Sequence, residues 1–311
     1  TVAAMGSILI PAMVAQGYDA GFSSALSAIS GSLGTVIPPS ITFIIYGMIT
    51  GESIGDLFLS GIIPGLIFGF MLCIMVFIKS KKNGWKGETQ RASLKEIGRL
   101  FLDTIWGLLS PVIVLGGIYS GLFTPTEAAA VAVVYSLIVG IFIYKELRLA
   151  ELKETLFSTA KTTGMILLII MNAGIFSWVL TQQGIAASLT EMALALTDNK
   201  YIMLVIINIV FLCAGCVMDN TSALYILVPI IMPIAKALDI NMIQLGVILV
   251  LNLSIGQVTP PVGPNLYVAA DIGKVKFEEI CRKMVPLLLM SLLALLCITY
   301  IPALSLCLIP S

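Results

Sequence analysis

Apolar runs alternate with short polar segments along the whole chain, and the runs fall into two length classes. The runs at 57–78, 105–122, 164–180 and 285–306 can each cross a bilayer as one helix, since a membrane span needs about 20 apolar residues. Shorter runs occupy 3–14, 22–33, 41–49, 204–212, 223–234 and 242–251. This pattern predicts an all-α polytopic membrane protein in which some helices span the bilayer and others are broken or re-entrant.

A polar segment with helix-breaking residues, 252–265, separates the apolar runs Met242–Leu251 and Leu266–Ala270. Pro260 and Pro261 lack N–H groups and disfavour helical backbone before them, so a helix arriving from Met242 must end near Gly256. In hydrocarbon, backbone groups without partners are costly, and open backbone persists only where protein, water or an ion satisfies it. The break therefore predicts a binding site.

The segment Ser30–Ser40 repeats this pattern, and the two double prolines lie 260 − 38 = 222 residues apart. At that single offset further helix breakers and small residues coincide: Pro11 with Pro233, Ser32 with Ser254, Gly34 with Gly256, Gly51 with Gly273, and Pro64 with Pro286. The equivalent loops differ in charge. Residues 51–56 hold two acids and no base, whereas 274–283 hold Lys274, Lys276, Arg282 and Lys283. Bases mark the cytoplasmic side, so we predict inverted repeats with a binding site at the two breaks, as in secondary transporters.

The repeat organises the rest of the chain. Two short limbs, Leu204–Leu212 and Ala223–Ile234, flank the segment 213–222 and predict a re-entrant hairpin with a polar tip. Residues 3–14 then correspond to the second limb of an equivalent hairpin, and we expect a preceding segment to supply its tip. The predicted domains are a first repeat core (1–78), connecting scaffold helices with cytoplasmic basic loops (79–199), and a second repeat core (200–311). Residues 94–102 are interpreted as a short amphipathic piece within a basic loop and 147–157 as an amphipathic surface helix, and 181–199 are not placed.

Two local motifs have alternative explanations. Thr124, Pro125 and Glu127 form a capping box at a helix start, although a buried Glu could instead carry protons. Gly61, Gly65 and Gly69 form a ridge suited to close helix packing, although glycines are also frequent on lipid-facing surfaces.

Composition narrows the class. The chain is 59% hydrophobic and 11% charged, has no His, a mean hydropathy of +1.06 and zero formal net charge, which places it in the lipid bilayer and gives no reason to expect nucleic acid as a partner. Six Cys in apolar runs predict no disulfide framework, and Cys213 and Cys216 are best explained by packing of small residues. Without His the usual serine-protease base is missing.

Three classes of function remain to be compared. An intramembrane aspartyl protease would need Asp19 and Asp56 to meet, but the intervening span should carry them to opposite membrane faces, so we do not expect an enzyme. A passive channel would transport without ion coupling. Duplicated broken helices favour an ion-coupled transporter instead.

Each break offers carbonyls at the end of one half-helix and N–H groups at the start of the next, which suit a cation and an anion respectively. Neutral oxygens without clustered carboxylates favour sodium over calcium. We assign two sodium sites to Ser30, Ser32, Gly34 and Thr35, and to Asn220, Ser254, Gly256, Gln257 and Thr259. We assign the substrate anion to Ser40, Thr42, Thr221 and Asn265. Thr259→Val or Gly256→Leu should weaken sodium dependence and leave expression intact.

Taken together, six segments resemble the large membrane subunit of the TRAP (tripartite ATP-independent periplasmic) transporters. They are Gly6–Met13, Gly34–Ser40, Tyr46-Gly47 with Gly51, Gly55–Phe58, Phe123–Ala128 and Thr259–Gly263. The resemblance implies an elevator-type, ion-transporter-like fold in the bacterial inner membrane. It also implies sodium-driven import of an organic acid anion delivered by a periplasmic substrate-binding protein, and a small partner membrane subunit.

The resemblance leaves the substrate open. The family handles sialic acid, dicarboxylates and keto acids, and nothing in either break distinguishes a sugar acid from a dicarboxylate. We take sialic acid first and a dicarboxylate second. Another sodium-coupled anion transporter of the same inverted-repeat class is the alternative. In the family a preceding segment supplies the first hairpin tip, so the first sodium site is expected to be incomplete in this chain.

Overall fold

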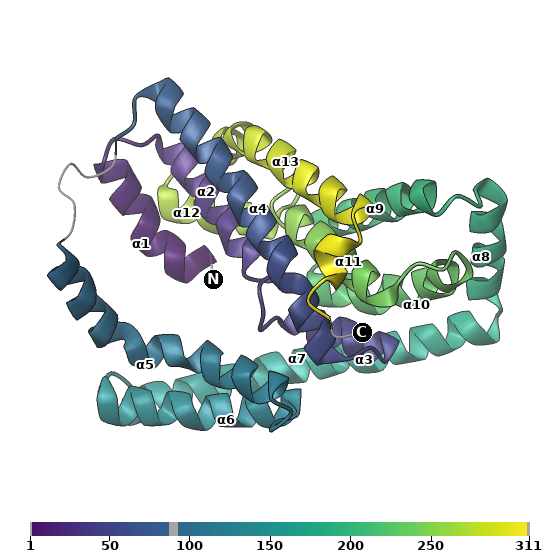
Figure 1. Cartoon of the computed structure of the whole chain (residues 1–311), viewed down its shortest axis with the longest axis horizontal. Coiled ribbons are helices and arrows are strands. Elements are labelled where there is room, and N and C mark those ends of the chain that lie inside the picture. Colours follow the sequence, from purple (N-terminus) through teal and green to yellow (C-terminus); the bar gives the residue numbers. More distant parts are fainter. Residues whose placement is uncertain (1, 87–92, 310–311) are drawn as a thin grey trace. The chain divides into compact units, whose positions relative to one another are not determined.

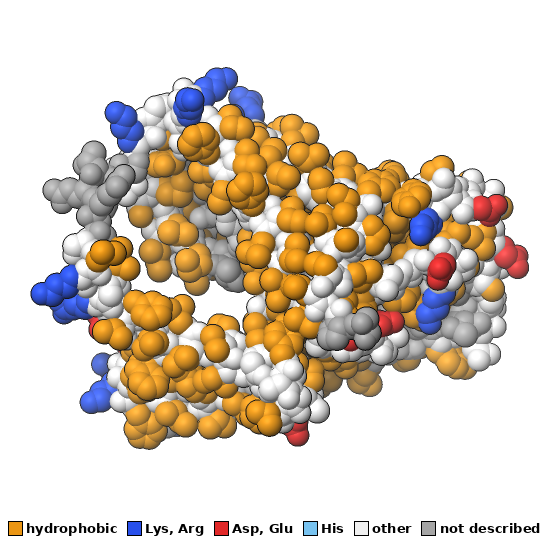
Figure 2. All heavy atoms as spheres, viewed as in Figure 1, with side chains coloured by type: hydrophobic (Ala, Val, Ile, Leu, Met, Phe, Trp, Pro, Cys, Tyr) orange, Lys and Arg blue, Asp and Glu red, His pale blue; other side chains and the backbone are white. Residues whose placement is uncertain are grey.

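The computed structural model describes residues 2–86 and 93–309, and these residues form helices joined by short connections, without strands (Figure 1). Seven of the helices are long and apolar enough to cross a membrane. Hydrophobic side chains cover most of the face shown in Figure 2. These features confirm an all-α polytopic membrane protein.

The helices have the following bounds, in chain order. They are α1 (Val2–Ala15), α2 (Ala20–Leu33), α3 (Ile41–Thr50), α4 (Ile54–Asn83), α5 (Leu94–Tyr119), α6 (Pro125–Ile138), the π-helical turn η1 (Val139–Ile143), α7 (Leu149–Gln182), α8 (Ile185–Leu196), α9 (Lys200–Val217), α10 (Asn220–Ala237), α11 (Met242–Gly256), α12 (Pro264–Gly273), α13 (Phe277–Tyr300) and α14 (Ala303–Leu306).

The chain divides into two compact units. One comprises residues 1–87 and 173–311 and contains both helix breaks, and the other comprises residues 88–172. In the smaller unit α5 packs against α6, and Tyr135 and Tyr144 donate hydrogen bonds to the carbonyls of Trp106 and Asp103. The domain boundaries predicted after residues 78 and 199 were taken from the sequence repeat and not from packing, and they stay a prediction.

The internal repeat is visible in where helices end. Helix α1 ends at Ala15 and α10 at Ala237, while α2 ends at Leu33 and α11 at Gly256. The half-helices α3 and α12 then begin at Ile41 and Pro264, so within the two break segments, 30–40 and 252–265, the residues between the helices are 34–40 and 257–263. Both breaks were predicted from their proline pairs, and the predicted end near Gly256 is confirmed.

Packing between the repeats is reciprocal. Helix α2 packs on α12 and α11 on α3, α2 packs on α13 and α11 on α4, and α1 packs on α12 and α10 on α3. Each contact therefore recurs with the two repeats exchanged, as a two-fold axis requires. The orientation of that axis in the membrane stays a prediction.

Four predicted boundaries are wrong. The pieces predicted at 94–102 and 105–122 form the single helix α5, and those at 147–157 and 164–180 form the single helix α7. The polar residues between the pieces, 103–104 and 158–163, include neither Gly nor Pro. Such residues change the polarity of a helix face but do not end the helix.

The other two wrong boundaries are helix ends. Helix α9 continues to Val217, so the hairpin connection is only Met218 and Asp219 and the two cysteines lie inside the helix. The last span begins at Phe277 and ends at Tyr300 rather than covering 285–306. Ile301, which precedes Pro302, has extended backbone (φ −119°, ψ 84°), as expected before a proline.

The glycine ridge of α4 packs against the first break. A Cβ on Gly61 would lie 2.8 Å from the Val36 carbonyl oxygen, and one on Gly65 would lie 2.7 Å from the Ile37 side chain. These two positions must remain glycine for the break to lie against α4, which supports the packing interpretation. The capping box is also confirmed, since Glu127 N–H donates to Thr124 Oγ1 and the Glu127 carboxylate accepts from Thr124 N–H.

Candidate functional site

The first break begins where the hydrogen bonding of α2 tightens. Thr35 N–H donates to the Ser32 carbonyl at 3.1 Å and Val36 N–H to the Leu33 carbonyl at 3.0 Å. In a continuing α-helix Thr35 N–H would reach the Gly31 carbonyl instead, so that oxygen drops out of the backbone ladder. The end of α2 therefore presents carbonyl oxygens at the negative end of the helix dipole, an arrangement that attracts a cation.

The second break has the same turn. Val258 N–H donates to the Ile255 carbonyl at 3.1 Å, the equivalent of the bond from Val36 to Leu33. Both valines are fully buried. In each break the peptide bond between the two prolines is cis. Two segments of different sequence thus form equivalent backbone structures.

In each repeat, hydrogen bonds join the start of the half-helix to the break that precedes it. Ser40 Oγ accepts from Phe43 N–H, which caps α3, and donates to the Thr35 carbonyl at 2.5 Å. In the second break Asn265 N–H donates to the Gln257 carbonyl at 3.2 Å, and Asn265 Nδ2 donates to Gln257 Oε1 at 3.2 Å. Thr35 and Gln257 are equivalent at the offset of 222, so both repeats fix the same carbonyl.

The two breaks meet through their hydroxyl groups. Thr35 Oγ1 lies 2.5 Å from Ser254 Oγ, although the residues are 219 positions apart. Thr35 is half-buried and Ser254 is fully buried. The structure therefore brings one predicted sodium ligand of the first break into contact with one of the second.

The connection between α9 and α10 lies beside the second break. A Cβ on Gly256 would be 2.5 Å from Gly215 Cα, so α9 and α11 touch backbone to backbone two residues before α9 ends. Asp219 caps α10 by accepting from Ser222 N–H at 3.0 Å and from Ser222 Oγ at 2.6 Å.

Asn220 is the first residue of α10, and only 7% of it is exposed. Its Oδ1 is buried without a hydrogen-bond partner among the described residues. A buried amide oxygen without a donor is rare and is suited to coordinate a cation.

The start of α1 takes the equivalent place beside the first break. A side chain on Gly31, near the end of α2, would collide with Val2, the first residue of α1. In the second repeat the corresponding contact is made by the end of α9, at Gly215, against Gly256 at the end of α11.

The remaining predicted sodium residues lie at or near the two breaks. Ser30 and Gly34 are exposed, and Ser32 is buried with its hydroxyl donating to the Ile29 carbonyl at 2.8 Å. Thr259 Oγ1 donates to the Ile255 carbonyl at 2.7 Å. In the described chain no group of three or more His, Cys, Asp or Glu side chains could hold a metal ion. The available ligands are therefore the neutral oxygens of the breaks.

The predicted substrate residues are less closely grouped. Ser40 and Thr42 lie at the start of α3, Thr221 in the first turn of α10 and Asn265 in that of α12. Helix α3 packs on α10, which brings the elements of the first three together. No hydrogen bond in the part of the chain that the structure describes joins any two of the four. Their assignment stays a prediction.

Sequence reasoning missed a buried polar ladder beside the second break. Asn252 Nδ2 donates to Asn208 Oδ1 at 2.6 Å, and Asn208 Nδ2 donates to Thr299 Oγ1 at 3.1 Å. Gln244 Nε2 donates to the Thr299 carbonyl at 3.1 Å. All four side chains are buried, and they link α9, α11 and α13. The available signal was amide residues inside strongly apolar runs, which need a partner in a membrane.

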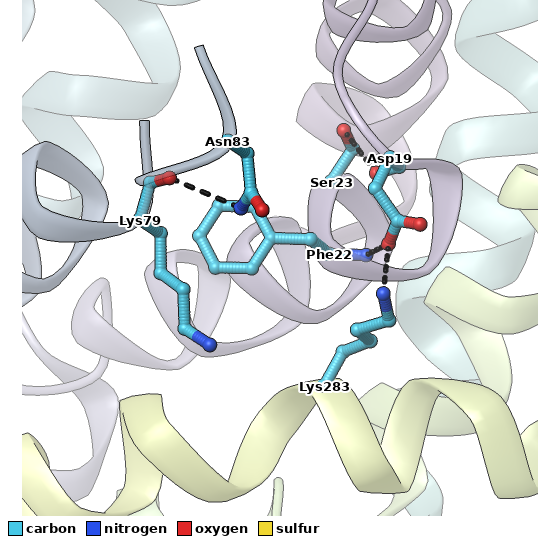
Figure 3. A network of polar contacts seen from close by, with 6 residues as sticks. All are labelled: Asp19, Phe22, Ser23, Lys79, Asn83 and Lys283. Carbon is cyan, nitrogen blue, oxygen red and sulfur yellow. Dashed lines mark hydrogen bonds and ion pairs between the residues drawn. The ribbon is translucent and has the colours of Figure 1, made fainter. Parts of the chain in front are cut away.

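Sequence reasoning also missed a charged contact between the repeats (Figure 3). Asp19 Oδ1 accepts from Phe22 N–H at 2.8 Å, which caps α2, and lies 3.0 Å from Lys283 Nζ on α13. Figure 3 shows the Asp19 carboxylate directed at Lys283, and a separate hydrogen bond in α4 from Asn83 Nδ2 to the Lys79 carbonyl. Asp19 is therefore engaged as a helix cap and in an ion pair, whereas Asp56 lies in the first turn of α4.

Comparison with known proteins gives a consistent result. Residues 1–304 match the family model of the "Tripartite ATP-independent periplasmic transporter, DctM component". The chain is 42% identical over 303 residues to an isethionate TRAP transporter permease protein, DctMQ, of Oleidesulfovibrio alaskensis, covering 97% of this chain and 48% of that protein. It is 42% identical over 308 residues to the C4-dicarboxylate TRAP transporter large permease protein DctM of Pseudomonas aeruginosa, covering 99% of this chain and 72% of that protein.

A third relative is named for a different substrate. The sialic acid TRAP transporter large permease protein SiaM of Vibrio cholerae is 36% identical over 302 residues, covering 97% of this chain and 70% of that protein. The chain thus spans about half the length of the isethionate relative and a larger share of the other two.

Proposed function

Because the chain belongs to the family of the DctM component of tripartite ATP-independent periplasmic transporters, we propose that it forms part of a large permease subunit that imports an organic acid anion with sodium. The family consists of transporter components and not of enzymes, so the intramembrane protease is set aside. The engagement of Asp19 with Lys283 agrees with this.

The observation that carries the proposal is the meeting of two equivalent helix breaks at Thr35 and Ser254. Broken helices at corresponding positions of two repeats are a feature of secondary transporters, whose ion and substrate sites lie where the repeats meet. A chain that only had to fill the membrane would have no need of open backbone there, since each unpaired group is costly in hydrocarbon.

Sodium is the proposed coupling ion because the breaks offer neutral oxygens. In the first site the ligands come from Ser30, Ser32, Gly34 and Thr35, and in the second from Asn220, Ser254, Gly256, Gln257 and Thr259. The buried Oδ1 of Asn220, which has no hydrogen-bond partner in the described part of the chain, supports the second site most directly. A calcium site would require carboxylates, and the break segments contain none.

The substrate is proposed to be a carboxylate or sulfonate anion held without a basic side chain in either break. The start of α3 at Ile41 contributes the positive end of a helix dipole, and Ser40, Thr42, Thr221 and Asn265 add side-chain donors nearby. At the start of α12, Pro264 has no N–H, and the N–H groups of Asn265 and Leu266 donate to the carbonyls of Gln257 and Gly263. The two relatives at 42% identity are named for isethionate and C4-dicarboxylates, and the sialic acid relative is 36% identical. We therefore place small acids ahead of sialic acid, which reverses the order taken from the sequence.

The proposed setting is the bacterial inner membrane. There the chain would work with a small membrane subunit and a periplasmic substrate-binding protein, and the hairpin and broken-helix core would move as an elevator. The reciprocal packing of α2 with α12 and of α11 with α3 supports a core that moves as one body.

Reconstituted uptake tests this function. The complete permease, with its small subunit and binding protein, is placed in proteoliposomes and given labelled succinate, isethionate or sialic acid. An inward sodium gradient should drive accumulation of one of these acids, and an equal potassium gradient should not. Equal uptake under both gradients would refute sodium coupling and favour a passive channel.

A further inference from the structure

We propose that the hydroxyl groups of Thr35 and Ser254 couple the two breaks, so that the two cation sites work as one unit and not independently. This inference rests on the proposed sodium coupling and adds to it a pair of residues that links the sites.

Thr35 and Ser254 have fewer hydroxyl protons than the hydrogen bonds that their oxygens could make. Thr35 Oγ1 lies 2.7 Å from the Ser32 carbonyl oxygen, Ser254 Oγ lies 2.7 Å from the Val250 carbonyl oxygen, and the two hydroxyl oxygens lie 2.5 Å apart. All three distances are those of hydrogen bonds. A hydroxyl carries one proton and a carbonyl carries none, so two protons must serve three contacts.

One of the three contacts must lack a proton. Two hydroxyl oxygens so close together cannot face each other without a proton between them. One hydroxyl must therefore donate to the other and release its own carbonyl. If Thr35 donates, the Ser32 carbonyl at the end of α2 is released. If Ser254 donates, the Val250 carbonyl of α11 is released.

A bound cation would favour one of these two proton arrangements. A cation at the first break needs oxygen lone pairs turned toward it, and it favours the arrangement in which the Thr35 proton points to Ser254. Ser254, which then accepts that proton, must donate to Val250. A cation at one break thus fixes the proton arrangement at the other, which is a coupling between two sites.

The surroundings keep this pair isolated from other influences. Ser254 is fully buried, and no Lys, Arg, Asp or Glu lies in residues 30–40 or 252–265. Within the residues that the structure describes, no other side-chain hydrogen bond joins the two breaks. A change at one break can therefore reach the other through this contact.

A double-mutant cycle on sodium dependence tests the coupling. Thr35→Val and Ser254→Ala are made singly and together in the complete transporter, and the sodium concentration for half-maximal uptake is measured. Each single change should raise it about tenfold, the effect of losing one buried hydrogen bond. The double change should also raise it about tenfold, because either change alone already breaks the contact.

Matched controls separate coupling from damage. Ser291→Ala removes a hydroxyl that donates to the carbonyl four residues before it, as Ser254 does, but Ser291 belongs to α13 and to neither break, and the change should leave sodium dependence unchanged. Thr35→Ser keeps the proton and should preserve the non-additivity with Ser254→Ala. Melting temperatures in potassium report folding, and Thr35→Ala replaces Thr35→Val if the valine variant does not fold.

The outcomes are distinct. A rise of roughly a hundredfold in the double variant means that the two residues act independently, and it overturns the inference while leaving sodium coupling in place. Uptake by the unaltered transporter that ignores sodium overturns both the proposed function and the inference.

Discussion

Gly256 touches the backbone of Gly215, since a Cβ on Gly256 would lie 2.5 Å from Gly215 Cα and 2.6 Å from its carbonyl carbon. The contact joins the last residue of α11 to α9, so the second break is held against the helix that leads to the hairpin connection. It also changes what a substitution at Gly256 can report. Sequence alone suggested that Gly256→Leu would alter sodium binding in an otherwise intact protein, but the structure has no room for the leucine.

Gly256→Leu should therefore lower stability and yield of folded protein, at an overpacking cost of about 1–3 kcal/mol or more. The measurement is the apparent melting temperature in detergent, in sodium and in potassium. Gly164→Ala is the control, because a Cβ there has nothing within 4 Å. A Gly256→Leu protein as stable as the unaltered one would show that α9 and α11 do not touch at this point.

Thr259→Val is the cleaner probe of the second break. It removes a hydroxyl at nearly constant volume, and the lost bond to the Ile255 carbonyl is local to one helical turn. The sodium concentration for half-maximal uptake should rise several-fold, with melting in potassium little changed. Thr104→Val is the matched control, since Thr104 makes the same bond to Leu100 in α5. An equal effect of both substitutions on sodium dependence would remove Thr259 from the site.

Asn220→Ala should separate stability from ion binding. The buried Oδ1 has no hydrogen-bond partner among the residues that the structure describes, so its removal relieves a desolvation cost, and the cap supplied by Asp219 is retained. Melting in potassium should stay the same or rise, whereas the stabilisation added by sodium should fall. If sodium stabilises the alanine variant as much as the unaltered protein, Asn220 is not a ligand.

The buried ladder should contribute to stability and not to ion affinity. Asn252→Leu leaves Asn208 Oδ1 without its donor and should cost about 0.5–2 kcal/mol, the range found for polar contacts between membrane helices. Changing Asn208 and Asn252 to Leu together should cost less than the sum of the single changes. Strictly additive losses in the apparent melting temperature would show that the two amides do not interact.

The break boundaries could be predicted because they follow from single residues. Proline pairs at 38–39 and 260–261 stop any helix, so the ends at Leu33 and Gly256 required no knowledge of packing. The continuous helices α5 and α7 were mispredicted for the opposite reason. Their polarity changes along the axis, and polarity alone does not say whether a backbone continues.

The contacts of the site could be predicted only in part. The repeat identified Thr35 and Ser254 as candidates, but their contact depends on the crossing of α2 and α11, which no local pattern encodes. The ladder of Asn208, Asn252 and Thr299 needed three helices to be in place. The ion pair between Asp19 and Lys283 joins residues that the sequence analysis considered separately, Asp19 as a possible protease carboxylate and Lys283 as a base on the cytoplasmic side.

Direct binding of radioactive sodium to the purified permease, without substrate or binding protein, tests the central claim that the two breaks hold sodium. The unaltered protein should show saturable binding that unlabelled sodium displaces and potassium does not, and Thr259→Val and Asn220→Ala should each weaken it. Absence of saturable binding, or binding that both variants leave unchanged, would contradict the assignment of sodium to the breaks.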